Sequence, residues 1–276
     1  MSSRLASRIF LGWFALIAAK IVAGMIIPVK APALPGAFAW LLASDFLVVA
    51  ALGLVAAASP VNGWTLATAL SLIPVFISGA NIIEGSVFLG NSTVPWGALF
   101  LSTCLAYLLV LPLWRYVFGG RPATTVHASW LTLQPATFIW KFAASDVLYL
   151  LLYFAAGSII FPFVRTFYAT QTVPSSVKIM ALQLLVRGPI FIGVCLLLAR
   201  LLALPRWKPA LAVGLAFSLL SGVAPLLIPN PFFPDSVRWV HMAEVTSSNF
   251  LFGAALKLLW SSKDEDALPP EMGHAA

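Results

Sequence analysis

The residues of this sequence that could do chemistry are ionisable side chains placed inside long apolar segments. They are Lys20, Asp45, Glu84, Asp146, Arg187, His241 and Glu244. On insertion scales, a charged side chain at the centre of a membrane costs about 2.5–3.5 kcal/mol, so it normally pairs with another group or serves a function. These residues are therefore the first candidates for a site.

The sharpest spacing lies near the C-terminal end of the sequence. Arg238, His241, Glu244 and Ser248 follow one another at steps of three, three and four residues, which places them on one face of a helix. A shorter polar face of the same kind is made by Ser78, Asn81 and Glu84. Because polar faces avoid lipid, we expect these two faces to look toward each other or toward a wet cavity.

Most of these residues fall in the outer half of the membrane when counted from the ends of the apolar segments. The candidates for ligand or ion binding are Lys20, Asp45, Asn81, Glu84, Arg187, His241, Glu244 and Ser248. Carboxylates beside a histidine can exchange protons. This favours a transporter-like protein with an outer-leaflet pocket for a cation, a proton or a small solute. The opposing interpretation is that the charges close on one another as interhelical ion pairs.

A metal site is an alternative interpretation of the same residues. His241 and Glu244 are spaced as two ligands on adjacent helical turns, and Glu84 could complete the set. Water on such a metal would be a nucleophile at neutral pH, so the protein would be an intramembrane enzyme acting on a lipid-type substrate. One histidine is few for a zinc site, so a divalent metal is not the favoured cofactor, and the cofactor stays unknown.

Asp146 is the exception to the outer placement. It lies near the inner end of its apolar segment, beside Ser145. Both residue types are typical of a helix N-cap, where the helix dipole favours a carboxylate. We therefore predict a structural role for Asp146.

The elements that must position these residues are membrane-spanning helices. The sequence has 276 residues, of which 61% are hydrophobic and only 9% are charged, whereas a soluble domain has about 25% charged residues. Apolar runs of about 20 residues are long enough to cross a bilayer. The sequence predicts an all-α polytopic membrane bundle of about eight spans: Ile9–Pro28, Ala37–Ala58, Thr65–Leu89, Pro95–Trp114, Phe142–Val164, Ile179–Ala199, Pro209–Ile228 and Trp239–Trp260.

The distribution of Lys and Arg predicts the orientation. With the N-terminus cytoplasmic, the inner side collects Arg4, Arg8, Arg115, Arg121, Lys141, Arg200, Arg206, Lys208, Lys257 and Lys263, and the outer side only Lys30, Arg165, Lys178 and Arg238. Both termini are thus predicted to be cytoplasmic, in a bacterial-type inner or plasma membrane. The formal net charge is +7, but the positive residues sit at helix ends and form no single basic patch, so we expect lipid and no nucleic acid as a partner.

Residues 1–263 are predicted to form one transmembrane domain, with halves at 1–120 and 142–263, an interfacial linker at 121–141 and a disordered cytoplasmic tail at 264–276. The first and fifth spans end in a similar order of residues: small-Gly, Ile-Ile, Pro, Val, then a cation at Lys30 and Arg165. This suggests a weak parallel four-plus-four repeat, a layout that some transporters use. Coincidence is the alternative, because outer helix ends draw on few residue types. The absence of an evident soluble domain also leaves open a non-catalytic role beside other membrane subunits.

Overall fold

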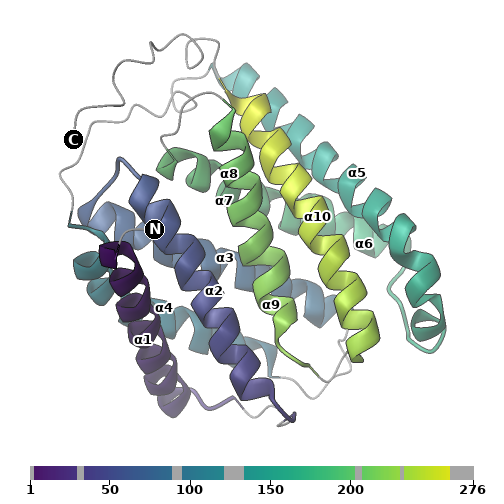
Figure 1. Cartoon of the computed structure of the whole chain (residues 1–276). Helices are drawn as coiled ribbons and strands as arrows, with labels where there is room; N and C mark the ends of the chain where they lie inside the picture. The colour runs from purple at the N-terminus through teal and green to yellow at the C-terminus, as the bar shows by residue number, and fades with distance from the viewer. Residues whose placement is uncertain are drawn as a thin grey trace.

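A computed structural model describes residues 3–29, 34–88, 95–120, 134–202, 207–230 and 233–261, and within these ranges it contains helices and no strands (Figure 1). The N-terminal half consists of α1 (Ser3–Ile26), α2 (Ala37–Ala58), α3 (Gly63–Phe88) and α4 (Trp96–Phe118). The C-terminal half consists of α5 (Pro135–Tyr168), α6 (Ser176–Leu182), η2 (Gln183–Arg187), α7 (Gly188–Leu201), α8 (Lys208–Ser218), η3 (Leu219–Val223), α9 (Ala224–Leu227) and α10 (Asp235–Trp260).

The protein is an integral membrane helical bundle, as its composition predicts. Within the described part of the chain, seven helices are long and apolar enough to cross a membrane; α6, η2 and α7 together make one of them, and α8, η3 and α9 another. The eighth predicted span, α10, is not among the seven. It has 26 residues, about 39 Å of helix at about 1.5 Å per residue, but it carries the polar stripe that lowers its hydropathy. It lies between α5 and α8 on the face of the bundle turned to the viewer in Figure 1.

The two halves of the bundle have the same pattern of helix neighbours. In the first half α4 packs against α1 and α3, and α1 also packs against α2. In the second half α10 packs against α5 and α8, and α5 also packs against η2 and α7. Two tryptophans near the ends of the last helices make matching contacts: Trp114 Nε1 donates to the Gly12 carbonyl at 3.1 Å, and Trp260 Nε1 donates to Ser145 Oγ at 2.9 Å. The two halves thus share this arrangement of neighbouring helices.

The halves meet through their middle helices. α3 of the first half packs against α7 of the second, and α2 of the first packs against η3 and α9 of the second. Ser44 Oγ donates to the Ala224 carbonyl across this contact at 2.7 Å. In the first contact the third helix of the N-terminal half meets α7 of the other half, and in the second contact α2 meets the π-turn and short helix that follow α8.

Two prolines each follow a π-helical turn. Pro189 lies just after η2, where the Gly188 N–H donates to the Gln183 carbonyl five residues back; Pro225 lies just after η3, where the Ala224 N–H donates to the Leu219 carbonyl. A proline ring crowds the carbonyl four residues before it and offers no N–H. The wider turn relieves that crowding, and π-turns of this kind often occur at functional sites.

The structure corrects two predictions about α5. The helix begins at Pro135, so residues 135–141 are part of it and do not belong to a separate interfacial linker. Asp146 consequently lies well inside the helix and is not an N-cap. The remainder of the predicted linker, residues 121–133, and the predicted tail, 264–276, lie outside the described residues.

Candidate functional site

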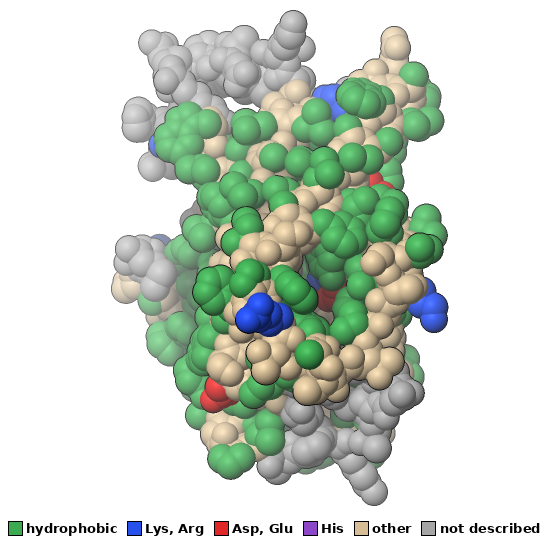
Figure 2. All heavy atoms as spheres, turned by 90° about the vertical axis from the view of Figure 1, so that its right-hand side faces the viewer, with side chains coloured by type: hydrophobic (Ala, Val, Ile, Leu, Met, Phe, Trp, Pro, Cys, Tyr) green, Lys and Arg blue, Asp and Glu red, His purple; other side chains and the backbone are tan. Residues whose placement is uncertain are grey.

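A cavity of about 510 Å³ lies in the half of the bundle where α3, α5 and α9 end, here called the far end. Its wall is built from α3, the start of α4, α5, η2, η3, α9 and α10. Figure 2 looks at the side of the molecule where α5 and α6 lie, and it shows a hollow framed by hydrophobic side chains with acidic and basic atoms at its bottom. Because α5 lines the cavity and the cavity contains charges of both signs, this hollow is its opening on the side of the bundle.

Most of the predicted site residues meet in this cavity. Those that line it are Asn81, Glu84, Arg187, His241, Glu244 and Ser248. They come from three segments far apart in the sequence, α3, η2 and α10. The polar residues of the third and eighth predicted spans thus border one cavity.

One side of the cavity is a hydrogen-bonded network around Arg187. Its guanidinium donates from Nη1 to Glu84 Oε1 at 2.5 Å and from Nη2 to Asn81 Oδ1 at 3.2 Å, and it lies 4.9 Å from the centre of the Phe191 ring. Gln183 Nε2 donates to the same Glu84 oxygen, and Tyr149 OH donates to Gln183 Oε1. The arginine side chain is only 5% exposed, whereas that of Glu84 is 24% exposed. The carboxylate thus faces the cavity while the cation is held behind it.

The opposite side of the cavity carries a chain of three groups. Glu244 Oε2 lies 2.7 Å from His241 Nδ1, and His241 Nε2 lies 2.8 Å from Tyr168 OH. The side chains of His241 and Glu244 are 14% and 11% exposed. The other oxygen of Glu244, Oε1, lies against Gly157 of α5, where a methyl group would be in van der Waals contact at 3.4 Å. Glu244, His241 and Tyr168 thus form one continuous hydrogen-bonded chain.

Close packing against α8 and η3 holds α10 in register. Gly214 and Gly253 bring the two backbones together, and Gly222 lies against Thr246, as small residues do where membrane helices approach closely. Asn249 Nδ2 donates to Ser221 Oγ at 2.8 Å across the same contact. The position of His241 and Glu244 is thus set by a helix interface and not by a loop.

Arg238, the outermost member of the α10 stripe, has a structural role. Its guanidinium donates to the carbonyls of Leu226 and Leu227, both at 2.8 Å, and pairs with Asp235. The carbonyls at the end of α9 have no partner further along their own helix, so Arg238 acts as their cap.

Lys20 and Asp45 are the predicted site residues that do not line the cavity. They form an ion pair between α1 and α2, with Nζ 2.5 Å from Oδ1. Of the single pocket expected from the first, second, third, sixth and eighth spans, the third, sixth and eighth line the cavity, whereas the first and second carry a separate ion pair. In the second half, the Tyr149–Gln183 bond joins α5 to η2 in a comparable way.

The predicted metal set of His241, Glu244 and Glu84 does not assemble. In the described ranges no group of three His, Cys, Asp or Glu side chains could hold a metal ion. Glu84 turns toward Arg187 and Gln183, and His241 Nε2 is hydrogen-bonded to Tyr168.

The sequence analysis missed several residues that complete the site. Gln183 stands four residues before Arg187 and therefore on the same helical face, a signal that was present in the sequence. Tyr149 and Tyr153 share a face of α5 for the same reason and line the cavity. Tyr168 gave no such signal, because its partner His241 lies 73 residues away in the sequence.

Comparison with known proteins gave no match: no protein family, no curated protein and no solved structure is similar to this chain.

Proposed function

We propose that this membrane protein is a transporter that binds a small solute in the far-end cavity and exchanges it against protons at Glu244 and His241. The observation that carries the proposal is the meeting of Glu84, Arg187, His241 and Glu244 around one cavity of about 510 Å³. Closed ion pairs with no space between them would have argued for a purely structural role. Cavities of roughly 300–1,000 Å³ are typical of small-molecule sites.

The proton step involves groups that are already hydrogen-bonded. Glu244 bridges to His241, and His241 bridges to Tyr168, so a proton taken up by the carboxylate or the ring stays within one chain of contacts. The fixed cation Arg187 balances Glu84 on the other side. Glu244 therefore carries the charge that a proton or a positively charged solute would neutralise.

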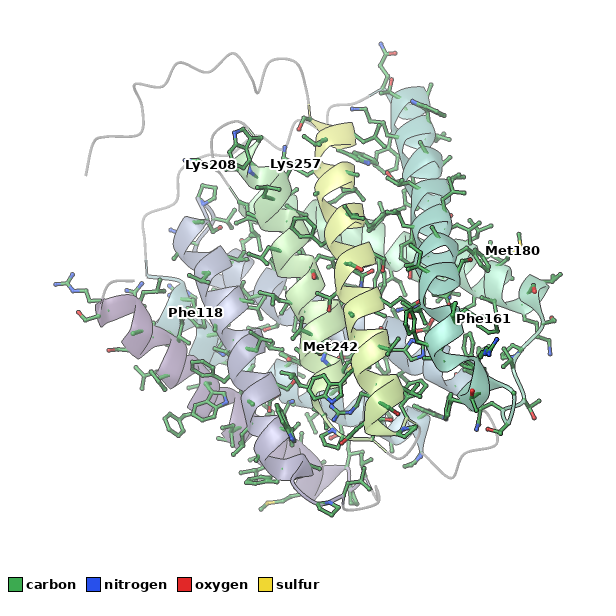
Figure 3. All side chains as sticks on the ribbon, turned by 45° about the vertical axis from the view of Figure 1, so that its right-hand side comes forward. Phe118, Phe161, Met180, Lys208, Met242 and Lys257 are labelled. Atoms are coloured by element: carbon green, nitrogen blue, oxygen red, sulfur yellow. The ribbon has the colours of Figure 1, made fainter. Side chains whose placement is uncertain are left out.

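The orientation of the protein belongs to the same proposal. The end of the bundle opposite the cavity carries Arg8, Arg115, Lys141, Arg200, Lys208 and Lys257, and Figure 3 shows Lys208 and Lys257 together at that end. The cavity end carries Arg165, Lys178 and Arg238, of which Arg238 is buried as a helix cap. This asymmetry supports cytoplasmic termini, an inner or plasma membrane and a cavity in the outer half.

Transport can be tested in liposomes that contain the full chain and carry a pH gradient. Uptake would be measured for radiolabelled glycine, glucose, succinate, choline and tetraphenylphosphonium, which cover distinct solute classes. We expect at least one class to show uptake that depends on the gradient and that is lost in Glu244→Gln. Ser247→Ala is the matched control, because Ser247 lies on the same helix, is exposed and bonds only to carbonyls of its own helix.

Two outcomes would count against transport. Uptake that is equal in the wild type and Glu244→Gln for every class would leave the cavity without a transport role. Constant co-purification with another membrane protein, together with absent uptake, would favour the subunit role. The metal-dependent enzyme is the least supported alternative, because its three proposed ligands do not come together.

A further inference from the structure

The cavity is lined by charged groups of both signs. The charged and titratable groups around Glu244 are His241 on the same helix, Tyr149, Tyr153 and Tyr168 on α5, Glu84 on α3 and Arg187 on η2. Among them are two carboxylates and one permanently charged cation, and that cation is bound to Glu84. With His241 neutral, the cavity thus carries one negative charge that no fixed cation balances. A ligand with one positive charge would complete it.

Much of the remaining cavity wall is aromatic. Aromatic side chains surround the polar groups: Phe88, Trp96, Tyr149, Tyr153, Phe167, Tyr168 and Phe233. Aromatic faces attract organic cations and also bury apolar groups. A hydrated inorganic ion would leave most of this wall without a suitable partner. The wall therefore fits an organic molecule with a substantial apolar body.

The position of the cavity opening indicates how a ligand would enter. The hollow in Figure 2 opens on the flank of the bundle and is framed by hydrophobic side chains. Helix α5 stands at this flank with few buried residues, namely Ser145, Tyr149 and Val164. Phe161 of α5 and Met180 of α6 point away from the bundle (Figure 3), and they are 54% and 42% exposed. A flank of this kind faces lipid chains, so the opening leads to the bilayer.

We infer that the ligand of this cavity is a hydrophobic organic cation that enters sideways from the bilayer and places its positive charge beside Glu244. This inference rests on the proposed function and names its substrate class. Glu244 lines the cavity and supplies the negative charge for the charged end, and the aromatic wall receives the apolar body. Cation and proton then compete for the same carboxylate, which supplies the exchange.

The test uses two probes of nearly the same size and shape and of opposite charge, tetraphenylphosphonium and tetraphenylborate. Binding of each to the purified full chain would be measured by equilibrium dialysis, with protein-free micelles subtracted. We expect the cation to bind at least about tenfold more tightly than the anion, since about 1.4 kcal/mol of charge preference gives that ratio. Glu244→Gln should remove the preference, and Ser247→Ala should keep it.

The remaining outcomes separate this inference from the proposed function. Equal or tighter binding of tetraphenylborate, no binding of either probe, or an unchanged preference in Glu244→Gln would overturn the ligand class. Gradient-driven uptake of another solute in liposomes would still stand as evidence of transport in that case. Selective cation binding without any uptake would keep the ligand class and reject transport.

Discussion

At the scale of single residues, the Glu84–Arg187 pair is unequal in its two members. The guanidinium is nearly fully buried, while the carboxylate side chain is partly exposed to the cavity. A carboxylate left alone can take up a proton, but an arginine cannot release one in a protein. Loss of Glu84 should therefore harm the fold more than loss of Arg187.

This difference gives the first prediction. Glu84→Leu should lower the free energy of unfolding by about 3 kcal/mol, the low end for breaking a buried pair. Arg187→Met should cost less, and the double variant should recover part of the loss, because it leaves no unpaired charge. Thermal unfolding of the purified variants in one detergent would give the order. A double variant less stable than both single variants would contradict the reasoning.

Gly188 offers a second test at this scale. The Asp146 carboxylate occupies the space that a side chain at position 188 would need, and the Gln183 carbonyl lies only 2.9 Å from that place. Gly188→Ala should therefore cost about 1–3 kcal/mol, as overpacking does. Asp146→Ala should restore part of the stability of Gly188→Ala. Gly193→Ala is the matched control, because its added methyl group would have no atom within 4 Å. Similar losses at positions 188 and 193 would show that the contact is unimportant.

The sequence predicted those site residues whose signal is local. An ionisable residue in an apolar helix stands out by type, so Glu84, Arg187, His241 and Glu244 could be found before their positions in space were known. Its partner cannot be found in the same way. The same signal grouped Lys20 and Asp45 with the cavity, because apolar runs fix depth in the membrane but not which helices are neighbours.

At the scale of elements, the prolines and glycines determine where the site can form. The π-turn before Pro189 carries Gln183 and Arg187, and the π-turn before Pro225 carries Ser221, the partner of Asn249. Of these groups, Arg187, Ser221 and Asn249 line the cavity. The sequence predicted a break at these prolines, but it did not show that a widened turn would result.

The interface between α8 and α10 carries the third prediction. A methyl group added at Gly253 would lie 3.0 Å from the Gly214 backbone, so Gly253→Ala should force the two helices apart. We expect a loss of about 1–3 kcal/mol and weaker binding of tetraphenylphosphonium, because α10 carries Glu244. Gly24→Ala, in open space on α1, should be neutral or stabilising by up to about 1 kcal/mol. Equal effects at both positions would refute the role of this interface.

Span prediction was right where apolar length alone decides. The bounds of α2 match the sequence prediction, and the apolar runs of seven helices are those expected. The prediction was weaker for α10, because its polar stripe lines the cavity and lowers the hydropathy of the helix. It was also weaker for the start of α5, because the first turns of that helix have no clear apolar boundary.

At the scale of the whole molecule, the two halves share a pattern of neighbours. In the first half, Lys20 and Asp45 join the first two helices by an ion pair. In the second half, tyrosines of α5 line the cavity. The cavity itself is built from both halves, because α3 and the start of α4 face α5, η2, η3, α9 and α10 across it. The short similarity between the ends of the first and fifth spans was the feature that suggested a repeat in the sequence analysis.

The orientation of the whole molecule is the last prediction, and it decides which side of the membrane the cavity serves. Single cysteines at Lys178, Lys208 and Lys257 would be made in a background where Cys104 and Cys195 are alanine. A maleimide that cannot cross membranes should label position 178 in intact cells, and positions 208 and 257 only after lysis, because the excess of Lys and Arg marks the cytoplasmic end. Inverted labelling would place the cavity in the cytoplasmic half, and the same proton exchange at Glu244 would then load the solute from the opposite side.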